Sequence, residues 1–178
     1  MQGIEADLRS LIDACYGLRG PETAIITPAG QPHDPHQALK AFHRYRDKEG
    51  AVSQATFLAE PDIHNAVSAF LSIVLEGQIR NLPRAPGCLL VNCAATVTSE
   101  LPEVGRLLDE TFAGTQKMIA RRFGEEVEKG ALPADFPIIE RARLLVDFMN
   151  AQAVRIRAGE EPSKIEAEIP QKVRLVLS

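Results

Sequence analysis

The sequence is poor in several features that define whole classes of proteins. It contains no tryptophan and only 5% aromatic residues, which argues against a large aromatic cage for a ligand. Its three cysteines, Cys15, Cys88 and Cys93, are an odd number without CxxC spacing. This usage favours buried thiols in a reducing cytoplasm over a disulfide framework.

Long apolar runs and excess positive charge are also missing. No apolar run reaches the roughly 18 residues of a membrane span, and Glu5 and Asp7 lie near the N-terminus in place of a basic region. We therefore expect a cytoplasmic protein without a signal peptide or contact with a membrane. The formal net charge of -4 supplies no general basic field, so net charge gives no argument for nucleic-acid binding.

Apolar residues that recur every three or four positions predict an all-α fold. The 178 residues, 45% of them hydrophobic, suit one main domain with a small appendage and a core that needs no disulfide or metal. Gly50 and Pro170 mark positions of a kink or break, and no segment alternates with the period of two that strands show. We expect helices over residues 4–17, 36–59, 61–82, 88–98, 101–130, 138–158 and 162–177.

The helix expected over residues 138–158 has apolar residues on two faces, whereas covering one core needs a single stripe. Either this helix is central in its own subunit, or its second face packs on another subunit. In the second case the last helix supplies the partner surface, and two helices from each subunit form the interface of a homodimer. The predicted interface residues are Leu144, Phe148, Ala151, Ile165, Ile169, Val173 and Leu177.

Several short runs resemble one protein family. They are Phe-His-Arg-Tyr at 42–45, Pro-Gly-Cys-Leu-Leu-Val-Asn at 86–92, Gly-Ala-Leu-Pro-Ala-Asp at 130–135 and Ala-Arg-Leu-Leu-Val at 142–146. From about residue 39 to residue 177 the sequence resembles the ligand-binding and dimerisation part of TetR/AcrR-type transcriptional regulators. The resemblance implies a TetR-like helical bundle, an all-α homodimer with a helix-turn-helix head, and an effector cavity in the larger domain.

The resemblance divides the chain into two parts. Residues 37–178 correspond to the ligand-binding and dimerisation domain, and residues 1–36 to a truncated, remnant or degenerate helix-turn-helix head with a Pro-rich loop. Arg19 and Thr23 are the head residues that would meet duplex DNA. The segment 22–28 lacks the Tyr and Phe that anchor the family's recognition helix, and residues 1–50 carry six basic against seven acidic residues. Readers of duplex DNA normally neutralise several phosphates, so DNA binding is left open.

An effector cavity should be mostly apolar with a few polar groups that orient the ligand. Polar candidates are the residues on otherwise apolar helices: Asn92, Thr96, Thr115 and Gln152. For the two threonines the alternative is a hydroxyl bonded to its own helix backbone. The expected apolar walls are Phe70, Val74, Phe112, Phe148 and Met149.

Catalytic and metal-binding patterns have little support. The histidines of residues 33–36 lie in a Pro-rich loop without helical spacing, and Cys88 and Cys93 point to different faces of a helix. We expect no enzyme activity, no metal and no cofactor. Two hypotheses are left: a homodimeric TetR-like regulator of transcription that binds a small, mainly apolar effector, or a dimeric helical ligand-binding module that has lost DNA recognition.

Overall fold

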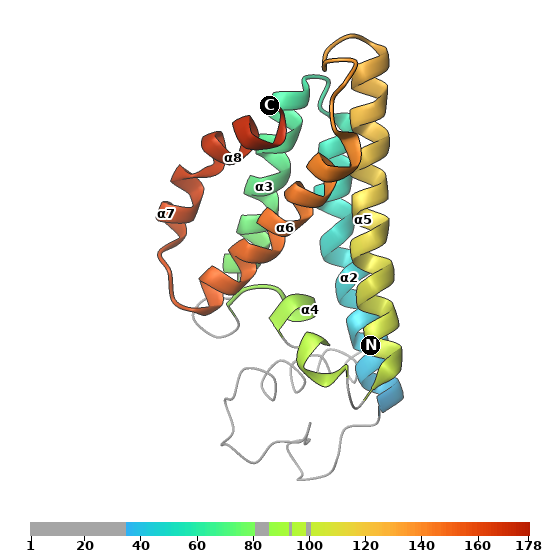
Figure 1. Cartoon of the computed structure of the whole chain (residues 1–178). Coiled ribbons are helices and arrows are strands. Elements are labelled where there is room, and N and C mark those ends of the chain that lie inside the picture. The colour runs from blue at the N-terminus through green and yellow to red at the C-terminus, as the bar shows by residue number, and fades with distance from the viewer. Residues whose placement is uncertain (1–34, 81–85, 93, 99–100) are drawn as a thin grey trace.

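The computed structural model describes residues 35–80, 86–92, 94–98 and 101–178 (Figure 1). Every regular element in these segments is a helix, which confirms the predicted all-α class. In chain order the elements are α2 (Pro35–Ala59), α3 (Ile63–Ile79), α4 (Leu89–Asn92), the 3₁₀ turn η1 (Ala94–Val97), α5 (Pro102–Glu128), α6 (Ile138–Arg157), α7 (Pro162–Ala167) and α8 (Ile169–Val176).

The long helices follow the sequence prediction closely. α2 runs through Gly50 without a break, because one glycine costs a long, packed helix only about 1 kcal/mol. α3 begins after Asp62, whose side chain accepts a hydrogen bond from the backbone N–H of Asn65 at 2.8 Å. The sequence context of Pro61 had indicated a position in the first helical turn. In the structure Pro61 lies before the cap instead.

Two predicted helices are divided in the structure. The segment 88–98, expected as one buried helix, forms the single turn α4 followed by η1. The segment 162–177 forms α7 and α8, which meet at Glu168. Pro170 lies in the first turn of α8, where its missing N–H removes no intrahelical hydrogen bond, so the expected break falls just before it.

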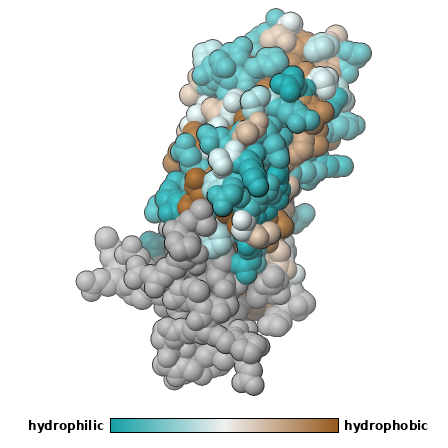
Figure 2. Space-filling model, turned by 90° about the vertical axis from the view of Figure 1, so that its left-hand side faces the viewer, coloured by the Kyte–Doolittle hydropathy of each residue, from teal (hydrophilic) through white to brown (hydrophobic). Residues whose placement is uncertain are grey.

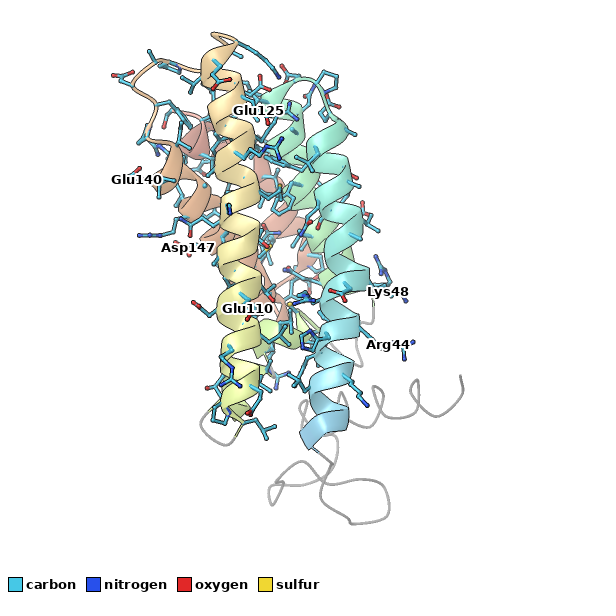
Figure 3. All side chains as sticks on the ribbon, turned by 90° about the vertical axis from the view of Figure 1, so that its right-hand side faces the viewer. Arg44, Lys48, Glu110, Glu125, Glu140 and Asp147 are labelled. Carbon is cyan, nitrogen blue, oxygen red and sulfur yellow. The ribbon has the colours of Figure 1, made fainter. Side chains whose placement is uncertain are left out.

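The helices form an elongated bundle. α2 and α5 lie side by side along one edge, and α7 and α8 lie at the opposite edge (Figure 1). On the outer side of this bundle Arg44 and Lys48 of α2 point away from the core, as do Glu140 and Asp147 of α6 (Figure 3). Across the described segments, no helix combines the length and the hydropathy that crossing a bilayer requires.

The hydrophobic core has two parts. The larger cluster joins α3, α6, α7 and α8 to the second half of α5, around Phe70 and Phe123. The smaller cluster joins the start of α2, α4 and the start of α5, around Phe42 and Leu107. Phe112 of α5 packs against both clusters, so it marks the boundary between them.

A buried arginine on α5 holds the C-terminal end of α2. Arg122 is 5% exposed, and it donates hydrogen bonds of 2.8–3.3 Å to the backbone carbonyls of Phe57, Leu58, Glu60 and Pro61. The Nε atom of Arg122 also donates to Glu126 at 2.8 Å. A hydrogen bond from Lys129, together with this guanidinium, lowers the pKa of Glu126 below its ordinary value. The cation thus satisfies carbonyls of the last turn of α2 and of its connection to α3.

A second ion-pair network joins the end of α6 to the last two helices. Arg155 makes paired hydrogen bonds of 2.6 and 2.7 Å to Glu160 and of 2.5 and 2.6 Å to Glu168. The hydrogen bonds from Arg155 are the main reason that the pKa of Glu168 falls to about 2, and Lys172 adds an ion pair at 3.2 Å. The same carboxylates raise the pKa of Arg155.

Candidate functional site

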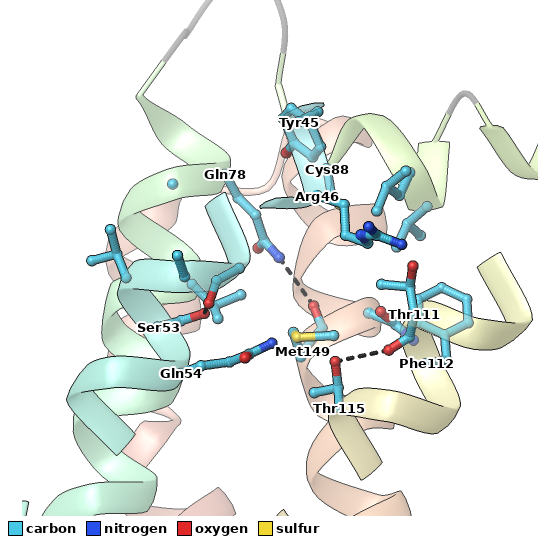
Figure 4. A pocket seen from close by; sticks show the side chains of 18 of the residues that line it. Tyr45, Arg46, Ser53, Gln54, Gln78, Cys88, Thr111, Phe112, Thr115 and Met149 are labelled. Atoms are coloured by element: carbon cyan, nitrogen blue, oxygen red, sulfur yellow. Dashed lines mark hydrogen bonds between the residues drawn. The ribbon is translucent and has the colours of Figure 1, made fainter. Parts of the chain in front are cut away.

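A cavity of about 450 Å³ lies among α2, α3, α5 and α6, with α4 at one end. Phe70 belongs to the larger core cluster and Leu90 to the smaller one, and both line the cavity, which therefore lies between the two clusters. Phe112 of α5 and Met149 of α6 complete the apolar wall (Figure 4). This volume is within the range of about 300–1,000 Å³ in which small-molecule sites usually fall.

A glycine keeps part of this space open. A Cβ atom placed on Gly114 of α5 would have no other atom within 4 Å, and Gly114 is part of the cavity wall. Gly114 is also exposed, so a larger side chain at this position meets no neighbouring helix. Glycine costs about 1 kcal/mol relative to alanine in a helix, so this position lowers the stability of α5 and leaves room that a side chain would occupy.

The residues predicted to contact an effector separate into two groups. The cavity wall contains Phe70, Val74, Phe112, Thr115 and Met149. Phe148 lies outside the wall, packed against the larger core cluster, with Nζ of Lys172 at 6.0 Å from its ring centre. The side chain of Thr96 lies outside the described residues.

The two amides predicted as ligand contacts join helices instead. Asn92 donates from Nδ2 to the backbone carbonyl of Ala153 at 3.4 Å. Gln152 is fully buried and donates from Nε2 to the backbone carbonyl of Leu71, also at 3.4 Å. Neither side chain is among the residues that line the cavity. In both residues a backbone carbonyl of a neighbouring helix accepts from the amide nitrogen, and Oε1 of Gln152 has no partner among the described residues.

The Gly-Cys-Leu-Leu-Val-Asn run fixes α4 against α6. Gly87 has a φ of +88°, and a Cβ atom there would lie 2.2 Å from Nδ2 of Asn92 and 2.6 Å from the carbonyl oxygen of Ala153. The N–H of Gly87 donates to the carbonyl of Gln78 at 2.8 Å. Only glycine fits this close approach. The result is that α4 is held beside the cavity, where Leu90 contributes to the wall.

Four polar side chains of the wall donate hydrogen bonds to backbone carbonyls. The hydroxyls of Ser53, Thr111 and Thr115 donate to the carbonyls of Gly50 at 3.1 Å, Leu107 at 2.6 Å and Thr111 at 2.9 Å. Thr115 thus makes the bond to its own helix that the sequence left open as an alternative. The amide of Gln78 donates from Nε2 to the carbonyl of Met149 at 3.1 Å (Figure 4).

Three of these polar wall residues were missed in the sequence: Ser53, Gln78 and Thr111. Gln78 continues the stripe of Phe70 and Val74 at the same four-residue step, and Thr111 precedes Thr115 by one turn, so both had a signal in the spacing. Ser53 lies in a polar stretch of α2 and had none.

The charged residues of the wall balance one another. Arg46 and Arg80 are basic, and Asp47 and Glu110 are acidic. A terminal nitrogen of Arg46 lies 2.7 Å from Oδ1 of Asp47, so this guanidinium already faces a carboxylate. The cavity wall therefore offers no excess charge that would select an ion of either sign.

The residues predicted for a dimer interface also separate. Ile165, Ile169 and Val173 are 0%, 3% and 7% exposed in the single chain, because they pack into its own larger core. This stripe has no surface to offer a partner, which corrects that part of the prediction. Leu144, Phe148 and Leu177 are half-buried against the same core, and Ala151 is exposed.

Other apolar side chains do face outward. Ile139 and Val154 of α6 are 53% and 54% exposed, and Leu175 of α8 is 47% exposed. The side of the bundle that carries α7 and α8 shows hydrophobic patches among mainly hydrophilic side chains (Figure 2). Arg141 of α6 donates to the carbonyl of Leu175 at 2.6 Å, so the start of α6 and the end of α8 are neighbours.

The predicted DNA-binding residues Arg19 and Thr23 lie outside the described residues, as does nearly all of the predicted head. Within the described segments, no group of three or more His, Cys, Asp or Glu side chains is arranged to hold a metal ion.

The long helices thus surround a ligand-sized cavity that is partly open to solvent. No protein-family model and no curated protein matches the sequence. Two solved structures do match, both of cysteine mutants of the TetR family transcriptional regulator CifR complexed with 26-base-pair double-strand operator DNA. They have TM-scores of 0.76 and 0.77 and 18% sequence identity, and they cover 96% and 97% of this chain and 94% and 95% of theirs. The chain thus has the fold that the family resemblance implied.

Proposed function

We propose that this chain is a transcriptional regulator of the TetR type, which acts as a homodimer and binds a small, mainly apolar effector in the cavity. The observation that carries the proposal is a cavity of about 450 Å³ inside a fold whose solved neighbours hold operator DNA. The apolar wall of Phe70, Phe112 and Met149 suits an apolar ligand body, and the polar groups between them suit orientation of that body.

The dimer would use the outward face of α6. Ile139, Ala151 and Val154 share this face, and Leu175 of α8 lies close to the start of the helix. Burying these side chains against a symmetry mate removes apolar area from water, at roughly 25 cal/mol per Å². This proposal keeps Ala151 from the sequence prediction, and it replaces the stripe on the last helices by the outward residues of α6 and α8.

In the proposed mechanism the effector changes the balance between two states of the dimer that differ in the spacing of the two heads. A ligand shifts such a balance only if it binds one state more tightly. DNA recognition would need heads spaced for two successive major-groove sites.

A second candidate is a dimeric helical ligand-binding module that has lost DNA recognition. The composition of the first 50 residues favours it, because six basic residues face seven acidic ones and the segment 22–28 lacks Tyr and Phe. This candidate shares the cavity and the dimer with the first and differs only in whether an operator is bound.

Gel-shift experiments with the full-length chain and the DNA upstream of its own gene separate the two candidates. A regulator gives a shift that survives non-specific competitor DNA and weakens with rising salt. Absence of a shift at low salt rejects the regulator. The module is then supported if a compound from a thermal-shift screen still raises the Tm.

Two variants test the cavity and the dimer. Gly114→Phe should fill the cavity and abolish the Tm increase produced by such a compound, whereas Ala113→Phe, exposed on the same helix outside the wall, should preserve it. Val154→Asp should convert the dimer to a monomer in sedimentation at micromolar concentration. Sedimentation of the unmodified chain as a monomer would contradict the homodimer.

A further inference from the structure

We infer that the ligand of the cavity is a hydrogen-bond donor: an apolar molecule that carries an N–H or O–H group, such as an amine, an amide or an alcohol. The inference rests on the proposed function, because it specifies the chemistry of the ligand in the same cavity. It follows from how four polar side chains of the wall, those of Ser53, Thr111, Thr115 and Gln78, already donate to backbone carbonyls.

Three hydroxyls in the wall, those of Ser53, Thr111 and Thr115, cannot donate a hydrogen bond to a ligand. Ser53, Thr111 and Thr115 each bond to a backbone carbonyl of their own helix, at 3.1, 2.6 and 2.9 Å. A carbonyl oxygen only accepts, so in each pair the hydroxyl must donate its single proton. What each hydroxyl still offers is an oxygen lone pair, which accepts a hydrogen bond from a donor.

Gln78 supplies a fourth acceptor, and its amide orientation is fixed. The side chain is 4% exposed and reaches from α3 towards α6 in the cavity wall (Figure 4). Its Nε2 must face the carbonyl of Met149, because the flipped amide would place two oxygens 3.1 Å apart. Oε1 of Gln78 has no hydrogen-bond partner among the described residues. Buried amide oxygens are nearly always paired in proteins, so a donor from a ligand would complete this site.

Ligands that only accept hydrogen bonds fit poorly beside these four side chains. An ether, ketone or carboxylate oxygen placed beside Thr115 or Gln78 would meet another oxygen. An anion gains little from the guanidinium of Arg46, which already lies against Asp47 at 2.7 Å. A ligand N–H or O–H group, in contrast, satisfies acceptors that the wall presents from α3 and α5.

Matched pairs of probes test the inference by calorimetry. Carbazole and dibenzofuran have the same shape and differ in a ring N–H against a ring oxygen, and indole and benzofuran form a smaller pair of the same kind. We expect the N–H member of a pair to bind about fivefold or more tightly. Thr115→Val and Gln78→Met should each reduce this ratio. Thr98→Val should leave it unchanged, because Thr98 bonds to the carbonyl of Ala95 and lies outside the cavity wall.

The outcomes separate the ligand class from the proposed function. Equal binding of both members, or tighter binding of the oxygen analogue, would overturn the donor inference while leaving the cavity as a ligand site, provided that Gly114→Phe abolishes binding. A preference that Thr115→Val and Gln78→Met both leave intact would also overturn it. No binding of any of the four probes at millimolar concentration would overturn both the donor inference and the effector cavity.

Discussion

Replacing Arg122 by methionine should destabilise the folded chain by about 3–5 kcal/mol. The guanidinium donates five hydrogen bonds: two to carbonyls in the last turn of α2, two to carbonyls of the connection to α3 and one to Glu126. Methionine keeps most of the apolar stem and removes every donor, so the variant isolates the polar part of the interaction.

The magnitude follows from what the removed group leaves behind. Glu126 is 3% exposed and keeps only the pairing with Lys129, at 2.9 Å. Removing one member of a buried ion pair typically costs about 3–5 kcal/mol, because the other charge stays buried. The carbonyls at the end of α2 lie nearer the surface, and water replaces part of their lost bonds, which argues against a larger value.

The neighbouring residue provides a matched control. Arg121 pairs with Glu125 at the same i,i+4 spacing and at 3.0 Å, yet its side chain is 83% exposed. Arg121→Met should therefore cost no more than about 0.5 kcal/mol. In the double variant Arg122→Met/Glu126→Leu, removal of the buried carboxylate should recover about 1–2 kcal/mol.

Urea unfolding followed by far-ultraviolet circular dichroism measures these differences. All variants must be compared at one protein concentration, because association of the chain would make its stability depend on concentration. A loss for Arg122→Met within 1 kcal/mol of that for Arg121→Met would refute the argument.

Two further predictions concern the turn before α4 and the network around Arg155. Gly87→Ala should lower the free energy of unfolding by about 3 kcal/mol, since it adds the strain of a positive φ and displaces the Asn92 amide. Gly130→Ala, with a φ of +75° and no atom within 4 Å of a Cβ, should show only the strain of about 1 kcal/mol in the same thermal unfolding assay. Glu168 has a pKa of about 2 in the folded chain against an ordinary 4.5, so its contribution to stability is present above pH 4.5 and is lost as the pH falls towards 2. Because the side chain is 38% exposed, Glu168→Gln should cost only about 1 kcal/mol near neutral pH and should reduce the loss of Tm on acidification; an unchanged acid profile would contradict this.

The bounds of the long helices were predictable because local chemistry sets them. Pro102 starts α5 and Gly130 follows its end, and both act through the backbone of their own segment. The surface against which the last helices pack was not predictable. Periodicity shows that Ile165 and Ile169 share an apolar face, but it does not show whether that face meets the chain's own core or another subunit.

The cavity was predictable only where apolar stripes form its wall. Phe70 and Met149 lie on such stripes, whereas Ser53 lies on a polar part of α2 that spacing alone assigns to solvent. Asn92 and Gln152, in contrast, were predicted to contact the ligand, and the structure places both outside the cavity wall. Each is a buried amide, and the sequence does not reveal that a carbonyl of a neighbouring helix is within its reach.

The contact of Gly87 with Ala153 joins two backbones with no side chain between them to deform. If α6 slides or rotates, residues 86–92 must travel with it, and so must Leu90 at the end of the cavity. Met149, one turn before Ala153, faces the same cavity. A displacement of α6 would therefore also displace residues 86–92, so that both sides of this end of the cavity would move together.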